Sequence, residues 1–275
     1  GRLMPAFWNI LHKAKKLGVS LVNLSSHGKP VLAYALDDVE YKEILNFLGV
    51  EAVNNEWYAT CICGTSNLIT GVLEDVYLEL LLFISEFWGS KFSSTSIKNI
   101  PLIKYVGYRN KSLCSISAIQ KGESKVCLSS DSCHVSWLID WNMEFASVSN
   151  VLFMPEITQE ALRLCSRKET LKKWLLDQVK VGSVSIRDYA VNLFDQSLCE
   201  RKVAIAFAHF LYQSLSKEYI LSREAVNLCA LMPLVDKYGN ITSTRKGVLV
   251  PANGSKWAGL TDSNLWRREG YVESV

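Results

Sequence analysis

The chain has 275 residues, a formal net charge of +3 at pH 7, 49% hydrophobic residues and 21% charged residues. This composition is typical of a folded globular chain and excludes an intrinsically disordered one. The charge balance lacks the strong basic excess of nucleic-acid-binding domains, so no nucleic-acid partner is expected. The most apolar stretch, residues 76–88, contains two glutamates and is shorter than the about 20 residues that span a bilayer, so no membrane span is expected.

The first half of the chain contains predicted helices and strands. Phe7, Ile10 and Ala14 recur at helical spacing before Gly18, which predicts an amphipathic helix over residues 4–17. The same patterns predict further helices over residues 39–48, 54–60 and 73–87. Strands are predicted over residues 30–36, 100–106, 113–119 and 125–128. We expect residues 113–119 to pair antiparallel with residues 100–106.

The second half is predicted to be more helical. Pro155 is a suitable start for a helical region over residues 155–194, which the pattern divides into two or three pieces. Two more helices are predicted over residues 200–215 and 223–231. Short strands are predicted over residues 232–235, 241–244 and 247–250.

These elements predict an α+β fold, mainly helical with short antiparallel β-sheets, in two helix-plus-sheet units. The small and polar residues before Pro155 mark the predicted boundary, so the units are residues 1–150 and residues 151–275. Residues 100–103 and 232–235 share a Pro-Leu pair, and each is followed by a glycine turn and a second predicted strand. This echo has two interpretations, a domain duplication or a chance match between short segments.

Eight cysteines raise the question of disulfide bonds. Disulfide frameworks belong to small secreted domains with thin cores, and this chain is long enough to bury a substantial core. Cys165, Cys199 and Cys229 lie in apolar periodic segments, where a free thiol behaves as a small hydrophobic group. Reduced thiols and an intracellular location are therefore predicted.

Two clusters resemble sets of metal ligands. Cys61 and Cys63 are separated by one residue, whereas Cys127 lies six positions before Cys133, which adjoins His134. Zinc sites usually pair ligands two to four residues apart, twice over, and neither spacing matches. The preferred interpretation is ordinary core or loop cysteines, so no metal and no cofactor are predicted.

A cysteine-dependent enzyme that uses Cys133 beside His134 is the alternative functional hypothesis. Such a nucleophile needs an imidazole and an orienting third group, and adjacent residues on a strand face opposite ways. The sequence has no Gly-x-Ser-x-Gly elbow and no glycine-rich phosphate loop. Glu51 and Asn55 have the spacing of the magnesium-binding helix in HSP90-like ATPases, but the accompanying Asp-x-Gly-x-Gly turn is missing. We predict surface roles for both residues and no enzymatic activity.

Aromatic residues supply the candidate interaction site. Four tryptophans lie in segments predicted as loops or mixed structure: Trp137, Trp141, Trp257 and Trp266. Trp266 is followed by Arg267 and Arg268, and these residue types are enriched at binding hot spots. Trp257, Trp266, Arg267 and Arg268 are therefore the predicted contact residues. The alternative interpretation is that these large aromatic side chains anchor loops to the core.

Six segments carry a resemblance to a known family: residues 57–58 (WY), 74–77 (EDVY), 100–107 (IPLIKYVG), 132–141 (SCHVSWLIDW), 232–239 (MPLVDKYG) and 244–257 (TRKGVLVPANGSKW). They resemble the large plant proteins related to NO VEIN and, more distantly, to sacsin. The similar segments span most of the chain but contain no catalytic motif.

The resemblance implies a very large intracellular parent protein, nuclear or cytoplasmic, with an HSP90-like ATPase region near its amino end. It also implies a chaperone-related or developmental role. Because ATP-binding motifs are missing, the chain resembles a segment outside that ATPase region. The implied function is a non-catalytic scaffold whose partners are other domains of the parent chain or other proteins. A part of an ATP-driven chaperone, with its nucleotide site elsewhere in the parent, is a further alternative.

Overall fold

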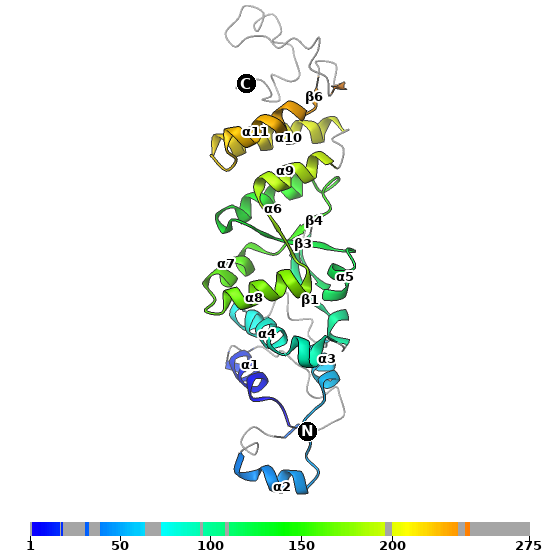
Figure 1. Ribbon diagram of the computed structural model, residues 1–275, viewed down its shortest axis with the longest axis vertical. Coiled ribbons are helices and arrows are strands. Elements are labelled where there is room, and N and C mark those ends of the chain that lie inside the picture. The colour runs from blue at the N-terminus through cyan, green and yellow to red at the C-terminus, as the bar shows by residue number, and fades with distance from the viewer. Residues whose placement is uncertain are drawn as a thin grey trace, which may run out of the picture. The chain divides into compact units, whose positions relative to one another are not determined.

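The computed structural model describes residues 2–16, 18, 31–32, 39–63, 73–93, 96–107, 110–195, 200–235 and 240–242. The described part is α+β and mainly helical, which confirms the predicted fold class (Figure 1). The chain forms two compact units: unit 1 is Gly1–Leu128 with Leu152–Ser183, and unit 2 is Ser129–Val151 with Val184–Val275. The chain passes between them three times, which differs from the single boundary predicted at residue 150.

Unit 1 holds most of the helices. Its helical elements are α1 (Pro5–Lys16), η2 (Val39–Tyr41), α2 (Lys42–Phe47), α3 (Asn55–Cys63), α4 (Glu74–Glu86), η4 (Trp88–Phe92), η5 (Ser96–Asn99), α5 (Ile116–Gln120), α7 (Glu156–Leu164), α8 (Lys168–Trp174) and η7 (Leu175–Val179). The predicted helix over residues 4–17 is confirmed as α1, which buries Phe7, Ile10 and Ala14.

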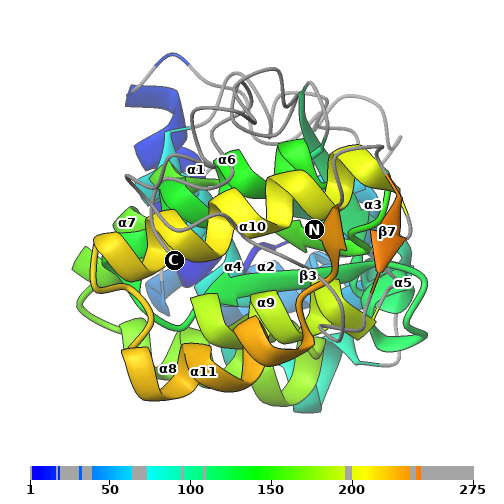
Figure 2. The same cartoon turned by 90° about the horizontal axis from the view of Figure 1, so that it is seen from above.

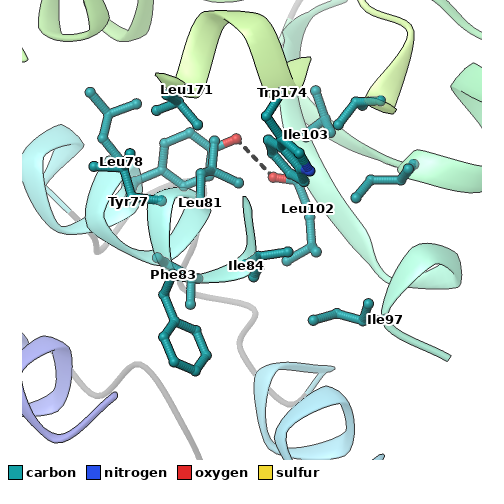
Figure 3. Packing of buried hydrophobic residues seen from close by; sticks show 14 of the residues in the cluster. Tyr77, Leu78, Leu81, Phe83, Ile84, Ile97, Leu102, Ile103, Leu171 and Trp174 are labelled. Carbon is teal, nitrogen blue, oxygen red and sulfur yellow. Dashed lines mark hydrogen bonds between the residues drawn. The ribbon is translucent and has the colours of Figure 1, made fainter. Parts of the chain in front are cut away.

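Helix α4 is the centre of the unit 1 core. Eight of its thirteen residues are buried, so apolar side chains cover nearly its whole circumference. Such a helix is stable only when other elements surround it. Figure 3 shows side chains of α4, including Tyr77 and Leu81, packed with Ile103, Leu171 and Trp174.

The strands of the larger sheet come from distant parts of the chain. They are β1 (Pro101–Val106), β2 (Lys111–Ser115), β3 (Lys125–Ser129), β4 (Val151–Phe153) and β5 (Gly182–Val184), in the order β2-β1-β4-β3-β5. β1 pairs antiparallel with β2 and with β4. The sheet as a whole is mixed, and its pairs β1–β2 and β1–β4 are antiparallel as expected. Only hairpin partners are forced to run antiparallel, and the neighbouring strands β3 and β4 are joined through helical residues 132–144.

The strand predicted over residues 113–119 is shorter than expected. β2 ends at Ser115, whose Oγ accepts a hydrogen bond from the N–H of Ala118 at 3.1 Å and so caps α5. α5 is followed by Gly122 in the left-handed region, with φ of +76°. A serine at the N-cap competes with strand pairing because it satisfies one of the free N–H groups of a helix start. The second part of the predicted strand is therefore helical.

Unit 2 is built around four helices and a small hairpin in its described part. Its elements are η6 (Ser132–His134), α6 (Val135–Glu144), α9 (Ile186–Asp195), α10 (Arg201–Ser216), α11 (Ser222–Leu231), β6 (Leu234–Val235) and β7 (Ile241–Thr242). α9, α10 and α11 lie side by side (Figures 1 and 2). The loop prediction for Trp137 and Trp141 is wrong, because both lie on α6, one helical turn apart.

Aromatic rings form much of the unit 2 core. Phe145, Tyr189 and Phe210 are fully buried, and the ring of Phe210 lies 6.0 Å from that of Phe145 and 5.8 Å from that of Tyr189. The Tyr189 hydroxyl also donates to Oδ1 of Asn142 at 2.8 Å. These contacts tie α9 and α10 to α6.

The internal echo corresponds to two hairpins. β6 pairs antiparallel with β7, as β1 does with β2, but β6 and β7 form a separate two-stranded sheet. The duplication therefore stays a prediction. The predicted strand over residues 247–250 lies outside the described residues, as does most of that over residues 30–36.

Candidate functional site

The most exposed apolar surface of unit 1 in the described residues lies on η2 and α2. Four large side chains are exposed there: Tyr41 (44%), Ile44 (57%), Phe47 (91%) and Leu48 (65%). We call these four residues the α2 surface. Among residues 40–49, whose burial is described, Leu45 is the one buried side chain. The helix therefore buries one residue beside its exposed apolar face.

Local sequence explains why the α2 surface forms. Tyr41, Ile44 and Leu48 are spaced by three and four residues, which places them on one helical face. The helix ends where the N–H groups of Leu48 and Gly49 donate to the carbonyls of Ile44 and Asn46. Gly49 has a φ of +69°, a conformation that glycine adopts without strain. The sequence predicted this helix, but periodicity alone does not show that its apolar face lacks a cover.

The predicted contact residues lie elsewhere in the chain. Trp257, Trp266, Arg267 and Arg268 are all outside the residues that the structure describes. The structure therefore does not test that candidate site. The α2 surface is a separate candidate that the sequence analysis did not single out.

The predicted cysteine and histidine lie in a short turn of unit 2. Oδ1 of Asp131 accepts a hydrogen bond from the backbone N–H of Cys133 at 2.9 Å, and its Oδ2 lies 3.4 Å from Nδ1 of His134. The side chain of Cys133 is exposed. In the described part of the molecule, no hydrogen bond joins the Cys133 thiol to the His134 imidazole. The carboxylate thus orients the imidazole, but the thiol is not coupled to it.

Two other cysteines have the character of core residues. Cys114 and Cys127 are buried free thiols, and burial raises the pKa of each to about 11. Cβ of an alanine at Gly182 would lie 2.7 Å from Sγ of Cys127, so the thiol fills space against β5. A buried protonated thiol is a poor nucleophile.

The structure brings together no metal-binding cluster in the residues it describes, where no three His, Cys, Asp or Glu side chains are suitably grouped. Cys127 is buried in β3 and Cys133 is exposed on η6. The side chains of Cys61 and Cys63 lie outside the described part. Glu51 precedes α3, whereas Asn55 begins it, so the two residues do not share a helix as an ATPase magnesium site would require.

A buried lysine in unit 1 is the feature that sequence analysis missed. Lys104 of β1 is 2% exposed, and its Nζ lies 2.7 Å from Oε1 of Glu74 on α4. Oε2 of Glu74 accepts a hydrogen bond from Oγ1 of Thr158 on α7 at 2.8 Å. The network therefore joins a strand to two helices. A lysine within a strand gives no sign in the sequence that its charge will be buried.

Tyr77 completes this network. Its hydroxyl donates to the carbonyl of Leu102 at 2.8 Å (Figure 3). The same hydroxyl accepts from the N–H of Lys104 at 3.2 Å. Burial raises the pKa of Tyr77 well above its ordinary value of 10.0, so the phenol stays protonated. Nζ of Lys104 also lies 4.2 Å from the centre of the Tyr77 ring. Each of these polar groups has a partner, which favours a structural role.

The longest helix in the described part, α10, has 16 residues, and no described helix is long and apolar enough to cross a bilayer. Comparison of the chain with family models, curated proteins and solved structures found no match.

Proposed function

We propose that this chain is a non-catalytic scaffold and protein-interaction segment that binds its partner through the α2 surface. The observation that carries this proposal is the exposure of four large apolar side chains along residues 41–48 of η2 and α2, with Phe47 91% exposed. Contiguous exposed apolar patches on folded chains are typical of interaction surfaces. The partner is another protein or another domain of the same parent chain.

In the free chain, the apolar side chains of the α2 surface stay in contact with water. An apolar side chain left in water forgoes about 1.5–3 kcal/mol relative to full burial. Ile44, Phe47 and Leu48 each forgo much of this in the free chain. A partner that covered them would recover that free energy. The aromatic Phe47 is of a residue type that often anchors interfaces.

The larger context of the proposal comes from the sequence resemblance. The resemblance supports a parent that is a large intracellular protein, nuclear or cytoplasmic, similar to NO VEIN and sacsin. In this proposal ATP is bound elsewhere in the parent. Calorimetry should therefore detect no ATP binding by this chain, and tight binding would contradict a non-catalytic role.

An antibody against the chain should detect a native protein far larger than 30.9 kDa. A band near that mass would remove the support for a large parent.

Site-specific photo-crosslinking tests the α2 surface directly. A photoreactive amino acid replaces Tyr41 in one sample and Leu164, which is 69% exposed on α7, in a control sample. In extracts of the source tissue, we expect a discrete adduct at position 41 and none at position 164. Excess wild-type chain should compete this adduct away, whereas excess Phe47→Ser should not.

Two outcomes would overturn the use of the α2 surface. One is the absence of any adduct at position 41 above the level at position 164. The other is equal competition by the wild-type chain and Phe47→Ser. Phe47 makes few contacts within the chain, so its substitution should leave the circular dichroism spectrum unchanged.

A cysteine-dependent enzyme is the second candidate function, because Asp131 supplies the orienting group that the Cys133 and His134 hypothesis needs. Thiol alkylation against pH tests it, with Cys133→Ser as the control. A rate midpoint for Cys133 well below the ordinary thiol pKa of about 8.5 would support an activated nucleophile. A midpoint at or above that value would exclude one.

A further inference from the structure

Two aromatic rings of unit 2 form a right-angled corner near the surface. The rings of Trp137 on α6 and Tyr219, which follows α10, have centres 5.4 Å apart and planes 85° apart. We call this pair the aromatic corner. Both side chains are partly exposed.

The aromatic corner is held in place by its surroundings. Nε1 of Trp137 donates to Oγ of Ser214 at 3.2 Å, and Ser214 is fully buried. The centre of the His134 imidazole lies 4.1 Å from that of the Tyr219 ring, and Oδ2 of Asp131 lies 3.4 Å from Nδ1 of the same imidazole. A ligand would therefore meet two rings whose orientation is already fixed, which lowers the entropic cost of binding.

A cation of the chain itself already occupies the aromatic corner. Nζ of Lys217 lies 5.2 Å from the centre of the Trp137 ring and 6.0 Å from that of Tyr219. Lys217 is exposed, and among the described residues no carboxylate pairs with it. The aromatic faces are thus the described groups that hold this ammonium. Their quadrupoles attract a cation placed over the ring.

We propose that the aromatic corner binds a methylated lysine side chain of another protein, which displaces Lys217. Lys217 is tethered beside the rings, so an ordinary lysine gains nothing by replacing it. A methylated ammonium is bulkier and less strongly hydrated, and aromatic cages favour such groups. Asp131, whose Oδ2 lies 3.4 Å from Nδ1 of His134, adds negative charge near the corner, which suits a cationic side chain and disfavours the phosphate of a choline lipid. This surface lies in unit 2 and is independent of the α2 surface.

Titration of the full chain with peptides tests the proposal. The probes are one short neutral peptide with a trimethyl-lysine and the same peptide with lysine or arginine at that position. Nuclear magnetic resonance of the Trp137 indole N–H reports binding, assigned by its loss in Trp137→Phe. We expect the trimethyl-lysine peptide to shift this resonance, and the other two peptides to bind at least about tenfold more weakly.

Substitutions separate a binding site from an accidental contact. Lys217→Ala removes the competing cation and should tighten binding of the trimethyl-lysine peptide about tenfold. Lys202 is an exposed lysine at the start of α10, and Lys202→Ala should leave binding unchanged. Tyr219→Leu keeps the reporter indole and should weaken binding about tenfold. Lys217 is exposed, so its removal leaves the fold intact and the test does not depend on the variants of the rings.

Three results would overturn the proposal. The first is equal affinity of the wild-type chain and Lys217→Ala for the methylated peptide. The second is equal affinity for the methylated and unmethylated peptides. The third is a response of the Trp137 indole to phosphatidylcholine vesicles but not to the methylated peptide, which would assign the corner to a lipid headgroup.

Discussion

Lys104 in unit 1 and Lys217 in unit 2 make the same kind of contact in opposite surroundings. Each places its ammonium over an aromatic ring, at 4.2 Å from the centre of Tyr77 for Lys104 and 5.2 Å from that of Trp137 for Lys217. Lys104 is 2% exposed and is paired with Glu74, whereas Lys217 is exposed.

The difference shows that the surroundings of a cation–π contact decide its role. Lys104 is 2% exposed, so its charge depends on the carboxylate of Glu74, and the pair fixes β1 against α4. The charge of Lys217 exchanges its ring contact for water at little cost. The first lysine is therefore a structural element, and the second leaves a surface that another cation can occupy.

Removal of the buried charge should have the largest effect. The side chain of Glu74 is 14% exposed, and Lys104→Ala leaves its carboxylate without a cation. We expect the free energy of unfolding to fall by about 3–5 kcal/mol, measured by urea denaturation. The control is Lys13→Ala, which breaks the exposed pair with Glu79 and should cost no more than about 1 kcal/mol. Similar losses in the two variants would contradict the structural role of Lys104.

Loss of the hydroxyl that supports Glu74 should have the next largest effect. Thr158→Val keeps the shape of a fully buried side chain but removes the hydrogen bond from Oγ1 to Glu74. We expect a loss of about 2 kcal/mol, because the bond is made to a charged group. Thr158→Ser keeps the hydroxyl and should lose less than Thr158→Val. The reverse order would mean that packing, not the hydrogen bond, matters at this position.

Loss of the Tyr77 hydroxyl should cost about 1 kcal/mol near neutral pH and should also change the response to alkali. Burial raises the pKa of Tyr77 in the folded chain above 10.0, so above about pH 10 the unfolded chain releases this proton first. Ionisation then stabilises the unfolded state, and the free energy of unfolding falls as pH rises. Tyr77→Phe should therefore show a shallower decline between pH 9 and about pH 11 than the wild type. Tyr189 and the buried thiols remain in both proteins, so parallel declines would contradict this assignment.

Removal of the exposed cation should have the smallest effect on stability. Lys217→Ala should lower the free energy of unfolding by no more than about 1 kcal/mol, since the contact is exposed to water. Thermal unfolding followed by circular dichroism measures the change, with Lys202→Ala as the matched variant. A loss as large as that of Lys104→Ala would show that both lysines are structural.

Much of the fold follows from local patterns. The spacing of Phe7, Ile10 and Ala14 predicts α1, and Pro155 together with the pattern after it predicts α7. The end of β2 at Ser115 was missed, although the cap residue is visible in the sequence. The prediction of loops or mixed structure for Trp137 and Trp141 is wrong, although their spacing of four residues agrees with a helix.

The candidate sites depend on contacts that no local pattern contains. Residues of β1, α4 and α7 meet around Lys104, with Thr158 separated from Glu74 by 84 positions in the chain. Trp137 and its partner Ser214 are 77 positions apart. The positions of these residues in the sequence do not show that they are neighbours in space.

The sequence by itself determined the helical segments and the mainly helical α+β class, because hydrophobic periodicity and end residues act over a few positions. It also predicted the helix over residues 39–48 that contains α2. Only the tertiary structure decided which stripes are covered and which charges are buried, because burial depends on segments that are distant in sequence. The tertiary structure thus made Lys104 an internal ion pair, Lys217 an exposed cation on two rings, and Phe47 an uncovered side chain.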